Sequence, residues 1–164
     1  MKVSIVAAVS ADGFIARNDH ELADWSSKED KKVFVELTKR AGVMIMGGNT
    51  YRTIGRALPG RRNIVYSRQA ILQDGIETTQ EAPAALLERL AREGYAEVAI
   101  CGGRAIYDMF LQAGLVTDLY LTLEPTLFGV GITLAAASLH VTLRLAESTK
   151  LNDDTLLLHY EVQQ

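Results

Sequence analysis

Apolar runs and amphipathic segments alternate along most of the chain. Five short runs are largely apolar, which predicts strands buried on both faces of a sheet: 3–10, 43–46, 64–67, 97–101 and 118–123. Three segments repeat apolar residues at helical spacing and predict amphipathic helices: 26–40, 81–92 and 104–113. The last two segments, 141–149 and 155–162, are typical of antiparallel strands. This order predicts an α/β fold with a mostly parallel sheet and an antiparallel C-terminal edge.

Two further segments complete the outline. The polar stretch from Ala11 to Trp25 contains turn formers and predicts a loop, and a loop of this length often covers a functional site. A short helix is expected at 49–54, with Asn49 or Thr50 as its cap and Gly55 at its end.

The helix predicted at 26–40 carries an acid on its apolar side. Its core-facing stripe consists of Asp30, Val33, Phe34, Leu37 and Ala41. A carboxylate facing a core is costly unless it is paired, protonated or directed into a polar cavity, so Asp30 is a candidate for binding a ligand. Alternatively, Asp30 completes a helix capping box with Ser27, and Ser26 with Glu29 gives a second frame for the same motif.

Composition narrows the class of protein. The 164 residues are 48% hydrophobic and 23% charged, which predicts one globular domain over residues 1–164. The net charge of −3 does not favour nucleic-acid binding, and no apolar run approaches the length that spans a bilayer. Cys101 is the single cysteine and cannot form an internal disulfide, so we expect a cytoplasmic protein.

Two glycine pairs follow predicted strands, Gly47-Gly48 and Gly102-Gly103, and the second pair opens a helix. Glycines before a helix let backbone N–H groups approach a phosphate, although tight packing of a helix on a strand also favours glycine. If the strands are parallel, both pairs lie at one edge of the sheet, which favours an extended phosphate-bearing cofactor. Four arginines near this region could meet anionic groups: Arg56, Arg61, Arg62 and Arg68.

Other chemistries find little support. His20, His140 and His159 are widely separated and there is one cysteine, so no metal site is expected. The chain has no GxSxG or Walker motif, which disfavours catalysis by an activated serine and binding by a P-loop.

The chain resembles the dihydrofolate reductase family. The resemblance rests on VSIVAAVSADGFIA, on the spacing of Trp25, Asp30 and Phe34, on IMGGNTYRTIGRALPGRRNIVYS, and on ICGGRAIYDMFL and LYLT. A second resemblance, to the reductase domain of riboflavin biosynthesis, rests on SADGFIA, WSSKED, GGNT and GLVTDLYLTLEPTLFGVG. Both imply a three-layer fold with helices on both faces of the central sheet.

The first resemblance implies NADPH-dependent reduction of 7,8-dihydrofolate to tetrahydrofolate, with hydride transfer to pterin C6 and protonation of N5. It implies catalytic roles for Asp30, Trp25 and Thr122. The implied substrate-binding residues are Val6, Ala7, Asp30, Phe34, Ile54, Arg61, Cys101, Tyr107 and Thr122. The implied cofactor-binding residues are Ala8, Ile15, Gly47, Gly48, Asn49, Thr50, Ser67, Arg68, Gly102, Gly103, Arg104, Ala105, Ile106 and Tyr107.

Departures from the family pattern define the alternatives. Gly48 stands where the family usually has an arginine for the cofactor's 2′-phosphate, so a preference for NADPH over NADH would depend on Arg68 or Arg62. ELAD precedes Trp25 in a longer loop, and Lys31 stands where an apolar folate contact is common. The alternatives are reduction of 5-amino-6-(5-phosphoribosylamino)uracil and a nucleotide-binding domain without turnover. A monomer or a homodimer is expected.

Overall fold

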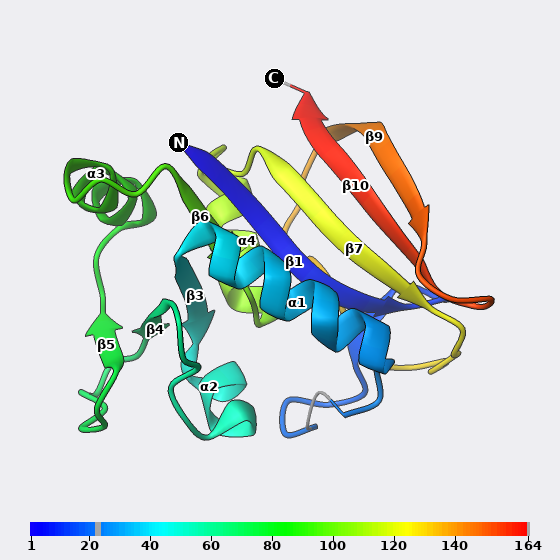
Figure 1. Ribbon diagram of the computed structural model, residues 1–164, viewed down its shortest axis with the longest axis horizontal. Coiled ribbons are helices and arrows are strands. Elements are labelled where there is room, and N and C mark those ends of the chain that lie inside the picture. Colours follow the sequence, from blue (N-terminus) through cyan, green and yellow to red (C-terminus); the bar gives the residue numbers. More distant parts are fainter. Residues whose placement is uncertain (22–23, 164) are drawn as a thin grey trace.

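The computed structural model describes residues 1–21 and 24–163 and contains one large sheet. Its strands are β1 (Lys2–Ser10), β3 (Val43–Gly47), β4 (Arg62–Tyr66), β5 (Ile76–Thr79), β6 (Glu97–Ile100), β7 (Asp118–Glu124), β9 (Thr142–Lys150) and β10 (Leu156–Gln163). They lie in the order β5-β4-β3-β6-β1-β7-β10-β9 (Figure 1). All pairs from β5 to β7 are parallel, whereas β10 is antiparallel to both β7 and β9. The predicted mostly parallel sheet with an antiparallel C-terminal edge is confirmed.

Helices cover both faces of this sheet. They are α1 (Lys28–Ala41), α2 (Gly48–Ile54), α3 (Pro83–Arg92) and α4 (Arg104–Gln112). Side chains of α1 and α2 pack with Met44, Met46 and Val65, whereas α3 and α4 pack with Ile45 and Ile64 on the opposite face. Alternate residues of β3 thus serve two cores, which explains why the strand is apolar throughout. The fold is the three-layer α/β arrangement that the resemblance implies.

Helix α1 begins and ends where its sequence predicts. The Ser27 hydroxyl accepts a hydrogen bond from the Asp30 N–H at 3.1 Å and caps the first turn. Gly42 ends the helix in the left-handed conformation at φ 74°, where glycine has no Cβ penalty. Leu37 and Ala41 are buried, and Phe34 is half-buried against the core, so the predicted apolar stripe is confirmed.

The structure adds the short strands β2 (Phe14–Ala16), β5 and β8 (Ile132–Thr133) to the predicted outline and moves the cap of one helix. The stretch expected to be a loop contains β2, which pairs with β8. Strands of two or three residues carry too little periodicity to be recognised in a sequence. Helix α2 begins at Gly48 with Gly47 as its cap and no side-chain cap bond, so the expected cap at Asn49 or Thr50 is wrong, whereas its end at Gly55 is confirmed. Leu22 and Ala23 of the predicted loop lie outside the described residues.

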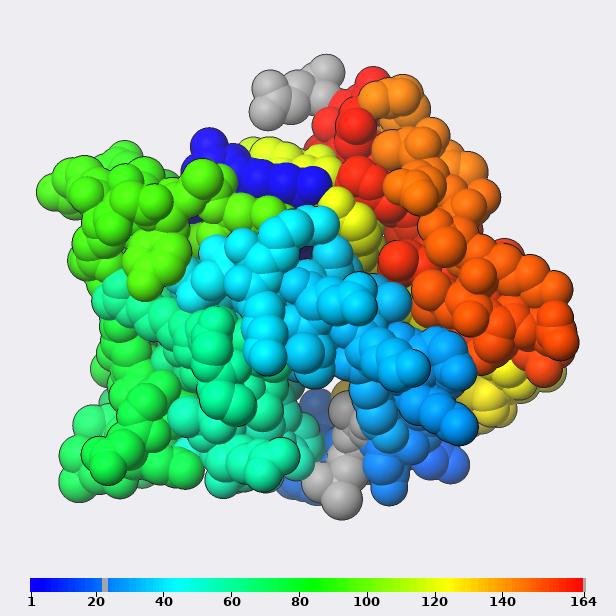
Figure 2. Space-filling model, viewed as in Figure 1, coloured from blue at the N-terminus to red at the C-terminus, as the bar shows by residue number. Residues whose placement is uncertain are grey.

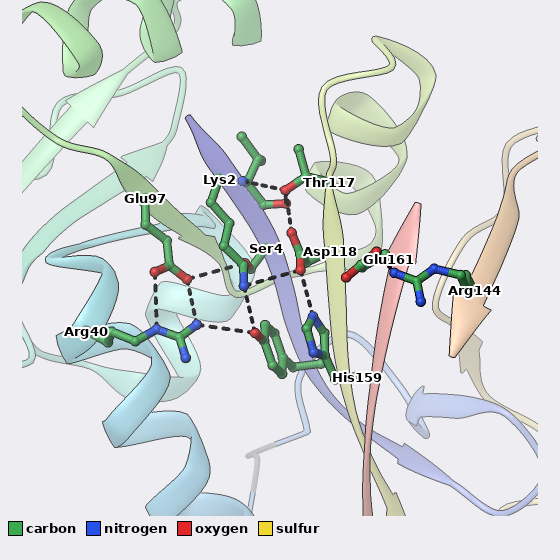
Figure 3. A network of polar contacts seen from close by, with 11 residues as sticks. Lys2, Ser4, Arg40, Glu97, Thr117, Asp118, Arg144, His159 and Glu161 are labelled. Atoms are coloured by element: carbon green, nitrogen blue, oxygen red, sulfur yellow. Dashed lines mark hydrogen bonds and ion pairs between the residues drawn. The ribbon is translucent and has the colours of Figure 1, made fainter. Parts of the chain in front are cut away.

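Ion pairs hold the amino edge of the parallel strands (Figure 3). Asp118 receives hydrogen bonds from the Thr117 hydroxyl at 2.6 Å and from His159 at 2.6 Å, and it pairs with Lys2 at 3.2 Å. Arg40, in the last turn of α1, pairs with Glu97 at 2.7 Å. This network, in which the charged groups pair with one another, joins α1 to β1, β6, β7 and β10 and leaves the carboxyl edge for a ligand site.

None of the helices among the described residues is long and apolar enough to cross a membrane. Within residues 1–21 and 24–163 there is also no group of three His, Cys, Asp or Glu side chains that could hold a metal ion.

Candidate functional site

The candidate site lies at the carboxyl edge of the parallel strands, where ligands bind in open α/β sheets. Helices α1, α2 and α4 all begin at this edge, where they follow β1, β3 and β6 of the large sheet along the chain. The space-filling view shows the surface hollowed between α2 and the N-terminal half of α1 (Figure 2). The two glycine pairs predicted to meet do so: the Gly47 N–H donates to the Gly102 carbonyl at 2.7 Å.

Asp30 faces β7 from the first turn of α1. Burial raises the pKa of its carboxyl, and hydrogen bonding with Ser26 and Thr122 opposes this shift. The negative charge of Glu124 raises the pKa further, and the positive charge of Lys31 lowers it. Thr122 is 2% exposed and stands opposite Ala8 in the register of β1 and β7. A mostly buried acid with a raised pKa at the carboxyl edge of the sheet is suited to exchanging a proton with a ligand or donating a hydrogen bond to one.

The capping and ligand-binding interpretations of Asp30 are therefore compatible. Its backbone N–H completes the Ser27 cap, while its side chain faces Ser26 and Thr122. In a full capping box the Asp30 carboxylate would also accept the Ser27 N–H. That N–H donates instead to Glu124 Oε1 at 2.9 Å, and the Ser27 hydroxyl donates to the same oxygen at 2.7 Å.

Three further predicted residues continue the site from Asp30 along the sheet. Tyr107 is 3% exposed, donates its hydroxyl to the Val6 carbonyl at 3.1 Å, and is near enough to Asp30 and Cys101 for their charges to act on it. Burial raises the pKa of Cys101 to about 12, and the positive charge of Arg61 opposes that shift. Electrostatic proximity thus links Asp30 to Tyr107, Tyr107 to Cys101 and Cys101 to Arg61, although Tyr107 belongs to the core cluster under α4 and Cys101 to the cluster under α1 and α2.

Arg61 has unused hydrogen-bonding capacity. Its Nη1 donates to the Pro59 carbonyl at 2.9 Å, but its Nε is buried and has no hydrogen-bond partner among the described residues. Burial lowers the pKa of the guanidinium, which is the sign of a cation that has lost water without gaining a carboxylate. The neighbouring Arg62 is different, because it pairs with Glu77 at 2.6 Å and also with Glu93. Arg61 is therefore free to bind an anion, whereas Arg62 is part of an internal network.

The glycine pairs let the starts of α2 and α4 pack closely against each other. Gly102 has φ +109°, and a Cβ there would come 3.3 Å from both the Thr50 hydroxyl and the Tyr107 hydroxyl. A Cβ on Gly47 would come 3.0 Å from the Ile106 side chain. These glycines bring the starts of α2 and α4 together with bare backbone between them, an arrangement that fits the phosphates of a dinucleotide.

The position of Gly48 is bordered by a cation that the sequence did not single out. A Cβ on Gly48 would lie 3.9 Å from Arg52 Nη1, and the Arg52 guanidinium donates to the Asn49 side chain. Ser67 and the exposed Arg68 follow β4 directly, next to the same glycine. An anionic group at this end of the site would meet Arg52 or Arg68.

Trp25 lies in the loop before α1 and packs edge to face on Phe128, with ring centroids 4.9 Å apart. Arg17 lies over the same Phe128 ring, 5.2 Å from its centroid. Asp12 accepts hydrogen bonds from the Phe128 N–H at 3.1 Å and the Gly129 N–H at 2.7 Å. The loop after β7 is thereby fastened to the loop after β1 that forms one wall of the site.

The remaining predicted residues occupy three regions of this edge. Val6, Phe34, Ile54 and Cys101 belong to the core cluster beneath α1 and α2. Ala7 and Ile15 belong to the cluster on the opposite face, and Ala8 is the one half-exposed residue in the second half of β1. Arg104 and Ala105 form the first turn of α4.

The structure adds Glu124, Asp12, Phe128 and Arg52 to the predicted set. Glu124 is 4% exposed and ends an otherwise apolar strand, so a charged residue at the carboxyl end of a predicted buried strand was the available signal. Nothing in the local sequence marks the other three, because their partners are distant or depend on helix geometry.

Comparisons with known proteins agree with this arrangement. A family model described as dihydrofolate reductase matches residues 2–129. Type 3 dihydrofolate reductase from Salmonella typhimurium is 35% identical over 108 residues, covering 65% of this chain and 63% of that enzyme. Dihydrofolate reductase from Neisseria meningitidis serogroup A is 36% identical over 124 residues, covering 74% of this chain and 72% of that enzyme. The crystal structure of a putative riboflavin biosynthesis protein from Shewanella sp. PV-4 has the same fold, with a TM-score of 0.82 at 20% identity over 100% of both chains.

Proposed function

This chain belongs to the dihydrofolate reductase family, and we propose that it reduces 7,8-dihydrofolate to 5,6,7,8-tetrahydrofolate with NADPH. Family membership supports an oxidoreductase of the dihydrofolate or riboflavin-pathway type. One observation carries the choice of dihydrofolate. A mostly buried acid, Asp30, and an arginine whose buried Nε has no partner among the described residues, Arg61, are linked through the charges of Tyr107 and Cys101.

Dihydrofolate offers complementary groups at its two ends. Asp30 would bind the N3 and 2-amino edge of the pterin, and Arg61 would pair with a carboxylate of the glutamyl tail. Phe34 of α1 and Ile54 of α2, which pack against the core cluster under these helices, would hold the ring and its benzoyl extension. A charge-assisted pair at Arg61 would restore the interactions that its guanidinium loses on burial.

The cofactor would occupy the glycine-lined part of the edge. Gly47, Thr50, Gly102 and Gly103 would hold its pyrophosphate, and its nicotinamide, which supplies the hydride, would lie by Ala8 and Ile15. The close approach of Thr50 to the Gly102 position supports this fit.

The residues of this chain would favour the proton that accompanies hydride transfer. C6 of the pterin gains the hydride and N5 gains a proton from solvent water, so the substrate gains two hydrogens and the cofactor leaves oxidised. A carboxylate bound at the pterin edge stabilises the cationic, N5-protonated pterin. Because burial raises its pKa, Asp30 can also carry a proton at a higher pH than an exposed aspartate.

Preference for NADPH over NADH would depend on the cations around Gly48. The sequence predicts this role for Arg68 or Arg62, but Arg62 is paired with Glu77 and Glu93. Arg52, beside Gly48, and Arg68, after β4, are the cations that could meet a 2′-phosphate.

The riboflavin-pathway substrate is the second candidate, favoured by the Gly-bearing loop that Asp12 fastens through Phe128 and Gly129. In that case Arg61 would pair with the ribose phosphate, and Asp30 would have no pterin to bind. Steady-state rates of NADPH oxidation with each substrate distinguish the two. Turnover of dihydrofolate alone supports the first candidate, whereas turnover of the phosphoribosylaminouracil alone replaces it with the second.

A further inference from the structure

Glu124 is a second carboxylate beside Asp30 that no predicted role uses. It ends β7, stands opposite Ser10 of β1, and is 4% exposed. Its Oε1 receives both hydrogen bonds that Ser27 can donate, one from the backbone N–H at 2.9 Å and one from the hydroxyl at 2.7 Å. The N-terminus of α1 thus supplies the donors and the partial positive charge that make a buried carboxylate tolerable there.

This arrangement gives Glu124 the place that Asp30 would hold in a capping box. An acid three residues after a serine cap ordinarily folds back and accepts the serine N–H. Here that N–H is already bound to Glu124, so the Asp30 side chain is left facing Ser26 and Thr122. The Asp30 N–H still donates to the Ser27 hydroxyl at 3.1 Å, and this bond keeps the first turn of the helix intact.

We propose that Glu124 is a positioning residue that caps α1 in place of Asp30, leaves the Asp30 side chain directed to Thr122 at the carboxyl edge of the sheet, and sets a second negative charge beside it. The proposal rests on the proposed function only for its effect on catalysis. Two carboxylates in one partly buried space repel each other, and a proton on one of them relieves the repulsion. The other charged or titratable groups acting with Asp30 are Lys31 on α1 and Tyr107 on α4.

The substitution Glu124→Gln separates charge from capping. Glutamine keeps an oxygen that accepts from Ser27 but removes the negative charge. Ser27→Ala is the matched control, because it removes the hydroxyl that caps α1 while keeping both carboxylates and the backbone N–H bond to Glu124. If Glu124 only stabilised the helix, each of the two variants would differ from wild type in Tm alone.

The test is the titration of Asp30 in the free protein, measured by NMR with 13C-labelled aspartate and assigned by the loss of its signal in Asp30→Asn. We expect the midpoint to fall by about one pH unit in Glu124→Gln and to stay at the wild-type value in Ser27→Ala. Equal midpoints in wild type and Glu124→Gln would overturn the proposal. This readout needs no turnover, so it stands even if dihydrofolate proves not to be the substrate.

Asp30→Asn gives a second test that does not require Glu124→Gln to fold. A released, repelled carboxylate destabilises the protein when it is ionised, so Asp30→Asn should raise Tm at neutral pH. A fall in Tm would mean that the Asp30 side chain is a stabilising cap after all, and the proposal would fail.

Discussion

Substitution of Arg61 by methionine should lower the affinity for dihydrofolate without loss of stability. Methionine keeps an apolar side chain of similar length but has no donor for a carboxylate. A charge-assisted arginine–carboxylate pair contributes about 2–3 kcal/mol, which corresponds to an increase of about 30- to 150-fold in KM. Because the Arg61 Nε is buried without a partner among the described residues and burial lowers the pKa of the guanidinium, Tm should stay equal or rise.

The adjacent arginine provides a matched control within the same segment. Arg62 pairs with Glu77 and Glu93, and its side chain is 27% exposed, so Arg62→Met should lower stability by about 1 kcal/mol and leave KM for dihydrofolate near the wild-type value.

The assay compares steady-state kinetics of both variants with dihydrofolate and with dihydropteroate, which lacks the glutamyl tail. Arg61→Met should weaken only the first substrate. Equal KM values for dihydrofolate in wild type and Arg61→Met, or an equal loss with both substrates, would refute the pairing of Arg61 with the tail.

Three other outcomes follow from the geometry. Asp30→Asn should lower kcat/KM at neutral pH by at least about 100-fold, because it removes the charge that stabilises a protonated pterin, and a rate equal to wild type would contradict this role. Burial raises the pKa of Asp118, but hydrogen bonds from Thr117, His159 and Lys2 outweigh it and lower the pKa overall. The contribution of Asp118 to stability should therefore be complete above about pH 4–5 and disappear as the pH falls through the pKa of the folded state. Denaturation of wild type and Asp118→Asn across pH should show the difference in their free energies of unfolding shrinking in acid. Arg52→Ala should weaken NADPH more than NADH in binding titrations, by about tenfold, whereas an equal loss for both would exclude contact with the 2′-phosphate.

Local patterns predicted the scaffold of the site. The stripe on α1, the glycine turns after β3 and β6, and the positions of most strands along the chain depend on periodicity and turn chemistry, which are encoded over a few residues. The predicted helix start at Ser27 is confirmed, and the structure shows why a cap and a cleft-facing acid can share Asp30: its N–H and its side chain have different partners.

What could not be predicted depends on contacts between distant segments. Glu124 reaches Ser27 only because β7 pairs with β1 and places its carboxyl end beneath the start of α1. The choice between Arg61 and Arg62 depends on where β4 begins, since adjacent residues point to opposite sides of a strand. Arg52 approaches Gly48 because residues four apart lie on one face of a helix.

The action of Asp30 on a pterin can be tested directly by one measurement. NADPH oxidation should be followed with dihydrofolate for wild type and Asp30→Asn across a range of pH, with the phosphoribosylaminouracil substrate in parallel. We expect wild-type turnover of dihydrofolate that Asp30→Asn loses at neutral pH and partly recovers in acid, where the pterin is protonated by solvent. Turnover of dihydrofolate by Asp30→Asn at the wild-type rate across neutral pH, or turnover of only the riboflavin-pathway substrate, would contradict the account.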